Sequence, residues 1–171
     1  MCIRDRLEEI RPQLEYLRVS EPSNRRFDLW LATTWRLEAQ LRASSDPRAA
    51  AAAAARAVEL VEKLIRQGRA INADFGECAK AYEVAGEIAA QAGDTAAAQG
   101  HWQHAAEILA PRMHGTRDWR LLDPAARVAA FTGHTKEARD TISKLTGLGY
   151  VPLDPWPELE RPDARTSNPN P

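Results

Sequence analysis

The sequence predicts an all-α fold built from stacked antiparallel helical hairpins, and three observations carry this prediction. Alanine is abundant and β-branched residues are sparse across the 171 residues, a composition that favours helix. Apolar side chains recur at spacings of three and four residues in successive stretches, as they do on one face of a helix. Between these stretches stand breaks such as Gly93–Asp94, where a glycine can end one helix and an aspartate can cap the next.

Composition argues against several function classes. The net charge is −1, so electrostatic attraction gives no case for nucleic acid or an anionic membrane as a partner. No apolar run approaches the ~18 residues of a membrane span, and no secretory signal is visible. Cys2 and Cys78 lack the spacing of a metal site or a disulfide framework, which suits a reducing compartment. We therefore expect a cytoplasmic protein without a cofactor and without a nucleic-acid or membrane partner.

Three segments are expected along the chain. Residues 1–6, Met-Cys-Ile-Arg-Asp-Arg, resemble the translation of a sequencing adapter, and such scars are left out of fold reasoning. Residues 7–153 are expected to form one helical domain, and the proline-rich residues 154–171 a disordered tail. If residues 1–6 are foreign, we expect the chain to be the C-terminal fragment of a larger protein.

The first helix is predicted over residues 7–19, where Leu7, Ile10, Leu14 and Leu17 share one face. This segment has the pattern of the second helix of a hairpin whose first helix is missing. Its apolar face would then be exposed and could pair with a second copy of the chain. Self-assembly through this helix is therefore one functional alternative.

The next hairpin is predicted from helices over residues 25–43 and 47–67. Asp46 can accept the first free amides of the second helix, and Pro47 fits the first helical turn. The run of alanines over 49–55 gives this helix a surface that permits close packing.

The clearest hairpin follows an expected loop over residues 68–77 and is predicted from helices over 79–92 and 95–109. The residues that define its pattern are Tyr82, Ala85, Gly86, Ala98, Trp102, Ala105 and Pro111. This stretch resembles a tetratricopeptide repeat, in which aromatic and small residues stand at fixed offsets on two helices. The resemblance implies a right-handed solenoid in which Gly86 and Ala98 let the two helix backbones approach.

The last hairpin is predicted from helices over residues 120–132 and 135–146, ending at Gly147. It aligns with the preceding hairpin at its central glycine, and this alignment matches Ala138 to Ala98 and Ile142 to Trp102. Residues 148–152 are expected to pack back as a cap, because a repeat array must cover its last apolar face. We expect Trp156 to be held against the body.

Candidate catalytic and metal-binding residues are few. His101 and His104 lie three apart and could reach one metal ion, but no third ligand stands at a fitting spacing, so a solvated helix face is favoured. Cys78 is interpreted as a structural cysteine rather than a nucleophile. The acidic residues that could act as acid or base are Glu77, Glu83 and Glu87, and solvated or groove positions are favoured for them. Without a phosphate-binding loop or a hydrolase motif, the chain is expected not to be an enzyme.

The resemblance to tetratricopeptide repeats implies a ligand groove along the first helices of the hairpins. Carried over by position, this groove would contain Trp35, Lys80, Glu83, Glu87, Gln91, Arg120, Asp123, Arg127 and Phe131. The charges of both signs predict no simple ligand class. The alternative is that these residues merely solvate a scaffold.

A second resemblance concerns the C-terminal half. Its motif consists of Gly133, Glu137, Ala138, Arg139, Leu145, Gly149 and Tyr150. Alanine-rich arrays with this ending look similar to the tails of bacterial serine/threonine protein kinases and of winged-helix regulators. This resemblance implies a sensory or docking tail, whereas the first resemblance implies a protein-interaction scaffold. A metal-binding helical protein using His101 and His104 is the third and weakest alternative.

Overall fold

The computed structural model describes residues 3–68 and 70–157, and the all-α prediction is confirmed for this part of the chain. Its elements are α1 (Ile3–Ser20), α2 (Arg25–Arg42), α3 (Pro47–Arg66), α4 (Asn72–Gln91), α5 (Thr95–Leu109), the short 3₁₀ helix η1 (Ala110–Arg112), α6 (Trp119–Phe131) and α7 (Thr135–Gly147). Within the described ranges no strand occurs, and no helix combines the length and hydropathy that a bilayer crossing requires.

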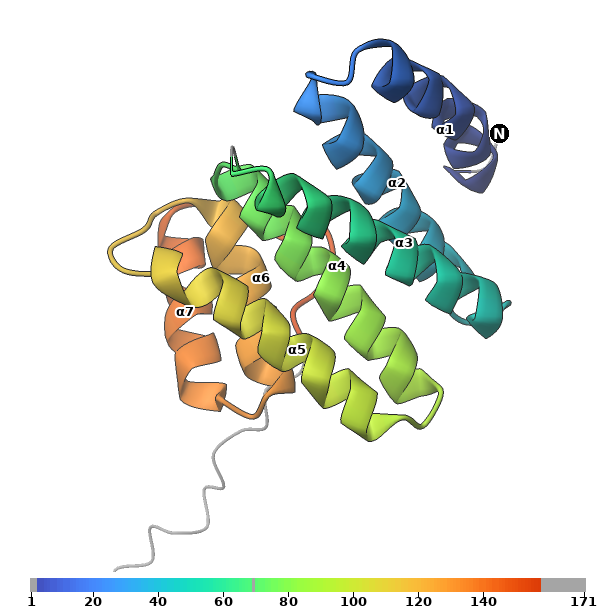
Figure 1. The fold of residues 1–171 in the computed structure, drawn as a ribbon. Coiled ribbons are helices and arrows are strands. Elements are labelled where there is room, and N and C mark those ends of the chain that lie inside the picture. Colours follow the sequence, from blue (N-terminus) through green and yellow to red (C-terminus); the bar gives the residue numbers. More distant parts are fainter. Residues whose placement is uncertain (1–2, 69, 158–171) are drawn as a thin grey trace, which may run out of the picture.

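Consecutive helices pack in pairs, and α4 lies at the centre of the molecule (Figure 1). The pairs α2–α3 and α4–α5 make the most extensive contacts, followed by α3–α4 and α6–α7. Helix α4 also contacts α2, α3 and α6, so α2, α4 and α6 lie next to one another. This layer carries most of the residues predicted for the groove.

Local chemistry sets several helix ends where the sequence predicts them. The Asp46 carboxylate accepts the Ala49 amide at 3.1 Å, and the Asp94 carboxylate accepts the Ala97 amide at 2.9 Å. Gly93 ends α4 with a φ of 82°, a left-handed conformation that glycine adopts without steric cost. Helix α5 therefore begins and ends at the predicted residues.

The predicted loop over 68–77 is wrong beyond its first residues, because α4 begins at Asn72. The Asp74 carboxylate accepts the Ile71 amide at 2.7 Å and pairs with the guanidinium of Arg25 in α2. Gly76, which falls within the predicted loop, lies inside the helix. A Cβ there would lie 2.2 Å from the carbonyl oxygen of Arg120, so the glycine permits α4 to approach α6.

The end of α7 also differs from the prediction. Gly147 still belongs to the helix, and the left-handed residue is Gly149 with a φ of 76°. The Tyr150 amide donates to the Leu145 carbonyl at 3.0 Å, which closes the last turn in the manner of a Schellman motif.

The apolar core follows the helix pairs. The buried alanines of α3, Ala50, Ala53, Ala54 and Ala57, pack in its two larger clusters. Leu7 and Leu14 of α1 are buried as well, and α1 packs on α2. The apolar face of α1 is therefore covered in part within the chain, while Ile10 on the same face stays 40% exposed. Self-assembly through this helix stays a prediction.

Residues 150–157 form an extended segment that we call the strap. The Tyr150 ring stacks on Trp119 at a centroid distance of 5.4 Å, and the Trp156 indole donates to Asp123 at 3.2 Å. Trp156 is thus held against the body, as predicted. Residues 154–157 were assigned to a disordered tail, but they make defined contacts with α6. The rest of that predicted tail, residues 158–171, lies outside the described residues.

Candidate functional site: the face of α2, α4 and α6

Charged residues of α4 and α6 meet at the centre of the predicted groove. The Lys80 ammonium lies 3.3 Å from the Asp123 carboxylate. The Arg127 Nε lies 3.8 Å from Glu83 and 3.5 Å from Asp123. Lys80, Glu83 and Glu87 share one face of α4 because they are spaced by three and four residues, and Asp123 and Arg127 are four apart on α6. The two faces together form one charged cluster.

The centre of this cluster is buried. The residues Glu83, Asp123 and Arg127 are at most 9% exposed. Burial raises the pKa of Glu83 to about 8, because removal of water penalises the carboxylate more than Arg127 stabilises it. Burial also raises the pKa of the half-buried Glu87. Of the two positions favoured for Glu83, solvated or in the groove, burial excludes the solvated one.

The other predicted groove residues lie around this cluster or away from it. Gln91 and Arg120 are exposed, and Arg120 pairs with Asp118 at 3.4 Å. Phe131 stacks on Trp102 at 4.7 Å with nearly parallel rings. Trp35 is not part of the cluster, because its ring packs beneath the guanidinium of Arg11 in α1, at 4.0 Å.

Two tryptophans that were not predicted for the groove flank a hollow on the same face. Trp30 of α2 is 49% exposed and Trp119 of α6 is 41% exposed. The hollow between them has a volume of about 180 Å³ and is floored by residues of α4, including Gly76 and Lys80. In the sequence, Trp30 only flanks an apolar stripe and Trp119 precedes the predicted helix, so neither position indicated an exposed ring.

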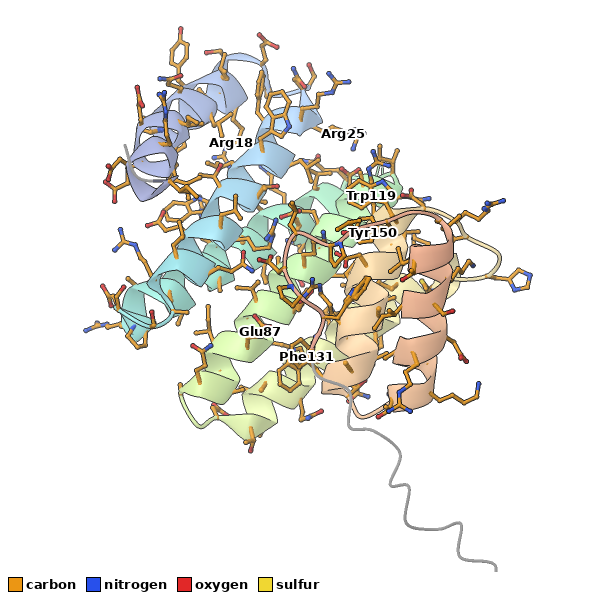
Figure 2. The ribbon with its side chains drawn as sticks, turned by 180° about the vertical axis from the view of Figure 1, so that it is seen from behind. Arg18, Arg25, Glu87, Trp119, Phe131 and Tyr150 are labelled. Carbon is orange, nitrogen blue, oxygen red and sulfur yellow. The ribbon has the colours of Figure 1, made fainter. Side chains whose placement is uncertain are left out.

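The strap crosses the face beside this hollow. Figure 2 shows it running over α4 and α6, from the stacked rings of Trp119 and Tyr150 toward Phe131. Arg127 donates through Nη1 to the Pro155 carbonyl at 3.1 Å and through Nη2 to the Asp154 carbonyl. The strap thus covers the charged cluster of α4 and α6 and leaves the hollow between Trp30 and Trp119 open.

Ion pairs also join α2 to α4. Arg36 makes a two-point contact with Glu77, with donor–acceptor distances of 2.6 and 3.4 Å. Arg25 pairs with Asp74, whose carboxylate is buried. These acids fell in the predicted loop, so sequence reasoning missed the pairs. A spacing of three residues between Asp74 and Glu77 was the available signal, since it places both on one helical face.

The residues predicted to pack the clearest hairpin lie in contact, with large aromatic rings against small residues. The Trp102 indole lies over Gly86 and donates to the Glu83 carbonyl at 3.2 Å. The Tyr82 hydroxyl donates to Glu62, and its ring contacts His104 at 4.5 Å. The remaining members of the predicted packing set are the buried Ala98, Ala105 and Ala138 and the partly buried Ile142.

The fold sets the surroundings of the histidines His101 and His104 and of the cysteine Cys78. His104 lies near Glu62 and Glu107, at 3.9 and 3.7 Å, and no group of three potential metal ligands occurs in the part of the chain that the structure describes. Cys78 is fully buried in α4, and burial raises the pKa of its thiol to about 12. A thiol held neutral in this way is a poor nucleophile.

Comparison of the chain with protein-family models, curated proteins and solved structures finds no match. The resemblances to tetratricopeptide repeats and to bacterial kinase or regulator tails therefore stay predictions.

Because the pKa of the buried Glu83 is raised, we expect the stability of the folded chain to depend on pH. It is faced by Arg127, Lys80, Asp123 and Glu87, and its pKa of about 8 exceeds the ordinary value of 4.5. Between these values the folded chain holds a proton that the unfolded chain has lost. The free energy of unfolding should therefore fall as pH rises from 5 to 8, by up to about 1.4 kcal/mol per pH unit for one proton.

Urea denaturation at pH 5, 6, 7 and 8 measures this slope, with the Glu83→Gln variant as the comparison. The variant cannot ionise at this position, so we expect its stability to depend less steeply on pH. Equal slopes for the two proteins would contradict the assignment of the proton to Glu83.

Proposed function

We propose that the chain is a protein-interaction module that binds a peptide or a partner domain on the face of α2, α4 and α6. The observation that carries this proposal is the hollow of about 180 Å³ between the half-exposed Trp30 and Trp119. Tryptophan is enriched among the residues that dominate binding energy at interfaces, and such residues tend to occupy the edges of well-formed pockets.

The charged contacts beneath this face support the same proposal. Arg36–Glu77 joins α2 to α4, and Lys80–Asp123 joins α4 to α6, so the hollow is bounded by helices that are tied together. A site held in its binding geometry loses less conformational entropy when a ligand arrives. Rigid helices with exposed aromatic rings therefore suit recognition of a protein segment.

The layer formed by α2, α4 and α6 supports a further proposal about architecture. In a right-handed, tetratricopeptide-like solenoid, the first helices of successive hairpins line the concave face. We propose this arrangement for the chain, as a cytoplasmic scaffold that carries no catalytic role of its own. The alternative parent protein is a bacterial serine/threonine kinase or a winged-helix regulator, in which the same face would serve a sensory or docking tail.

Selection from a library of random dodecapeptides on the immobilised chain tests the proposed function. We expect selected peptides to bind with Kd values of about 1–100 μM, the range of modest interfaces. Trp30→Ala and Trp119→Ala should each weaken binding by about tenfold or more, because each removes one wall of the hollow.

Tyr16→Ala is the matched control, since Tyr16 is an aromatic residue on α1 that is exposed to solvent. It should leave the affinity of the selected peptides unchanged. Failure to enrich any peptide, or peptides whose affinity is insensitive to both tryptophan variants, would reject this face as the interaction site.

A further inference from the structure

The strap is the only occupant of the α4–α6 face that the described residues provide, and its contacts define what this face can recognise. Arg127 donates to two successive backbone carbonyls of the strap, those of Asp154 and Pro155. Asp123 accepts the indole N–H of Trp156 at 3.2 Å. We call these two side chains, together with the Trp119 ring that stacks on Tyr150, the strap seat.

Burial and neighbouring charges fix the position of the Arg127 guanidinium in the strap seat. Glu83 and Asp123 lie on one side of the Arg127 guanidinium, with Nε distances of 3.8 and 3.5 Å. These acids hold the guanidinium in place while its Nη1 and Nη2 atoms donate to the strap. An arginine positioned in this way recognises adjacent carbonyl oxygens, because its donors form a rigid fork.

The prolines of the strap make its backbone a suitable partner for the donors of Arg127. Pro155 and Pro157 have no backbone N–H, so this part of the strap presents mainly carbonyl acceptors to a residue that can only donate. Each proline also favours an extended backbone at the residue before it, which applies to Asp154 and Trp156. The sequence Asp-Pro-Trp-Pro is therefore pre-shaped for the seat before it docks.

The strap is held by few contacts in addition to these. The side chains of Val151 and Leu153 are 81% and 100% exposed, and neither contributes burial to the docked state. Trp156 is itself only partly buried. A segment that is held by two partly buried aromatic rings and a few hydrogen bonds can be exchanged for another segment with the same groups.

We propose that the strap seat receives an extended partner segment in which a tryptophan stands between prolines, and that the strap is an internal copy of that segment. This inference rests on the proposed function, and it names the chemistry of the partner. The partner supplies two carbonyl oxygens to Arg127 and an indole N–H to Asp123, and it binds when the strap leaves the seat.

A labelled peptide with the sequence Val-Pro-Leu-Asp-Pro-Trp-Pro, which is that of residues 151–157, tests this inference by fluorescence anisotropy. The full-length chain is compared with its Trp156→Ala variant, in which the internal competitor has lost its indole. We expect the variant to bind the peptide at least about tenfold more tightly than the wild-type chain, since a competitor lowers the fraction of open sites.

Two matched controls accompany this comparison. Leu153→Ala alters a fully exposed side chain of the strap and should leave the affinity of the wild-type chain unchanged. A peptide with alanine in place of its tryptophan should bind the Trp156→Ala chain at least about tenfold more weakly, because the indole contact and its hydrogen bond to Asp123 are then missing.

Several outcomes would overturn the inference. Equal binding of the peptide to both chains would show that the strap does not compete, and binding to neither would show that the seat is no receptor. Wild-type dimers that disappear with Trp156→Ala would make a second copy the occupant. If library peptides bind in a Trp30-dependent manner but neither contain a Pro-Trp pair nor compete with this peptide, the proposed function survives and this inference fails.

Discussion

Replacing Gly86 with leucine is expected to destabilise the chain by about 3 kcal/mol or more, because α4 and α5 have no room for a side chain there. A Cβ at Gly86 would lie 2.3 Å from Trp102 Nε1 and within 2.8 Å of two further atoms of the ring. The indole cannot move away freely, since it donates to the Glu83 carbonyl and stacks on Phe131. Urea denaturation measures the change in the free energy of unfolding.

Gly100→Ala is the control for this substitution, because Gly100 lies on the open side of α5. No heavy atom comes within 4 Å of a Cβ built at Gly100. Alanine should therefore stabilise the chain there by about 0.5–1 kcal/mol through helix propensity alone. A Gly86→Leu variant with the urea midpoint of the wild type would refute the close approach of α4 and α5.

The second large effect is expected from Arg127→Met, at about 3–5 kcal/mol, the cost of leaving a buried charge without its partner. Arg127 lies between the buried carboxylates of Glu83 and Asp123 and also holds the strap. Methionine fills a similar length but neutralises neither acid. Because Glu83 can take up a proton below its pKa of about 8, the loss should be smaller at pH 5.5 than at pH 8.5.

Urea denaturation of the Arg127→Met and Glu83→Gln variants and of their double variant tests this account. We expect the double variant to recover part of the loss, because neutralising Glu83 removes one unpaired charge. Arg120→Met serves as the control on the same helix, since its pair with Asp118 is exposed and should contribute at most about 1 kcal/mol. Strictly additive losses in the double variant would contradict a shared charge network.

Features set by local chemistry could be predicted from the sequence, and features set by helix crossings could not. Asp46, Asp94 and Gly93 act on amides and turns within a few residues, so the ends of α3 and α5 were found. The role of Gly76 could not be predicted, because a helical glycine and a loop glycine look alike in sequence. The glycine is needed because a Cβ there would collide with the carbonyl oxygen of Arg120. Arg120 lies 44 positions away in the sequence, and only the fold brings it near.

The candidate site was predicted in part for the same reason. The resemblance to tetratricopeptide repeats assigned Lys80, Glu83 and Glu87 on α4 and Asp123 and Arg127 on α6 to one groove, and the fold brings these charged side chains together. Their burial could not be predicted, because it depends on the strap that returns over the face. Trp30 and Trp119 were missed because exposure of a large ring depends on what the neighbouring helices leave uncovered.

The helices differ in how many other helices they contact, so different parts of the native state should open with different free energies. Helix α4 contacts α2, α3, α5 and α6, whereas α1 packs mainly on α2. Amide hydrogens of α1 should therefore exchange with solvent through local opening, while those of α4 exchange only when most of the molecule unfolds. A partner that holds α2 against α4 would then protect amides far beyond the residues it touches.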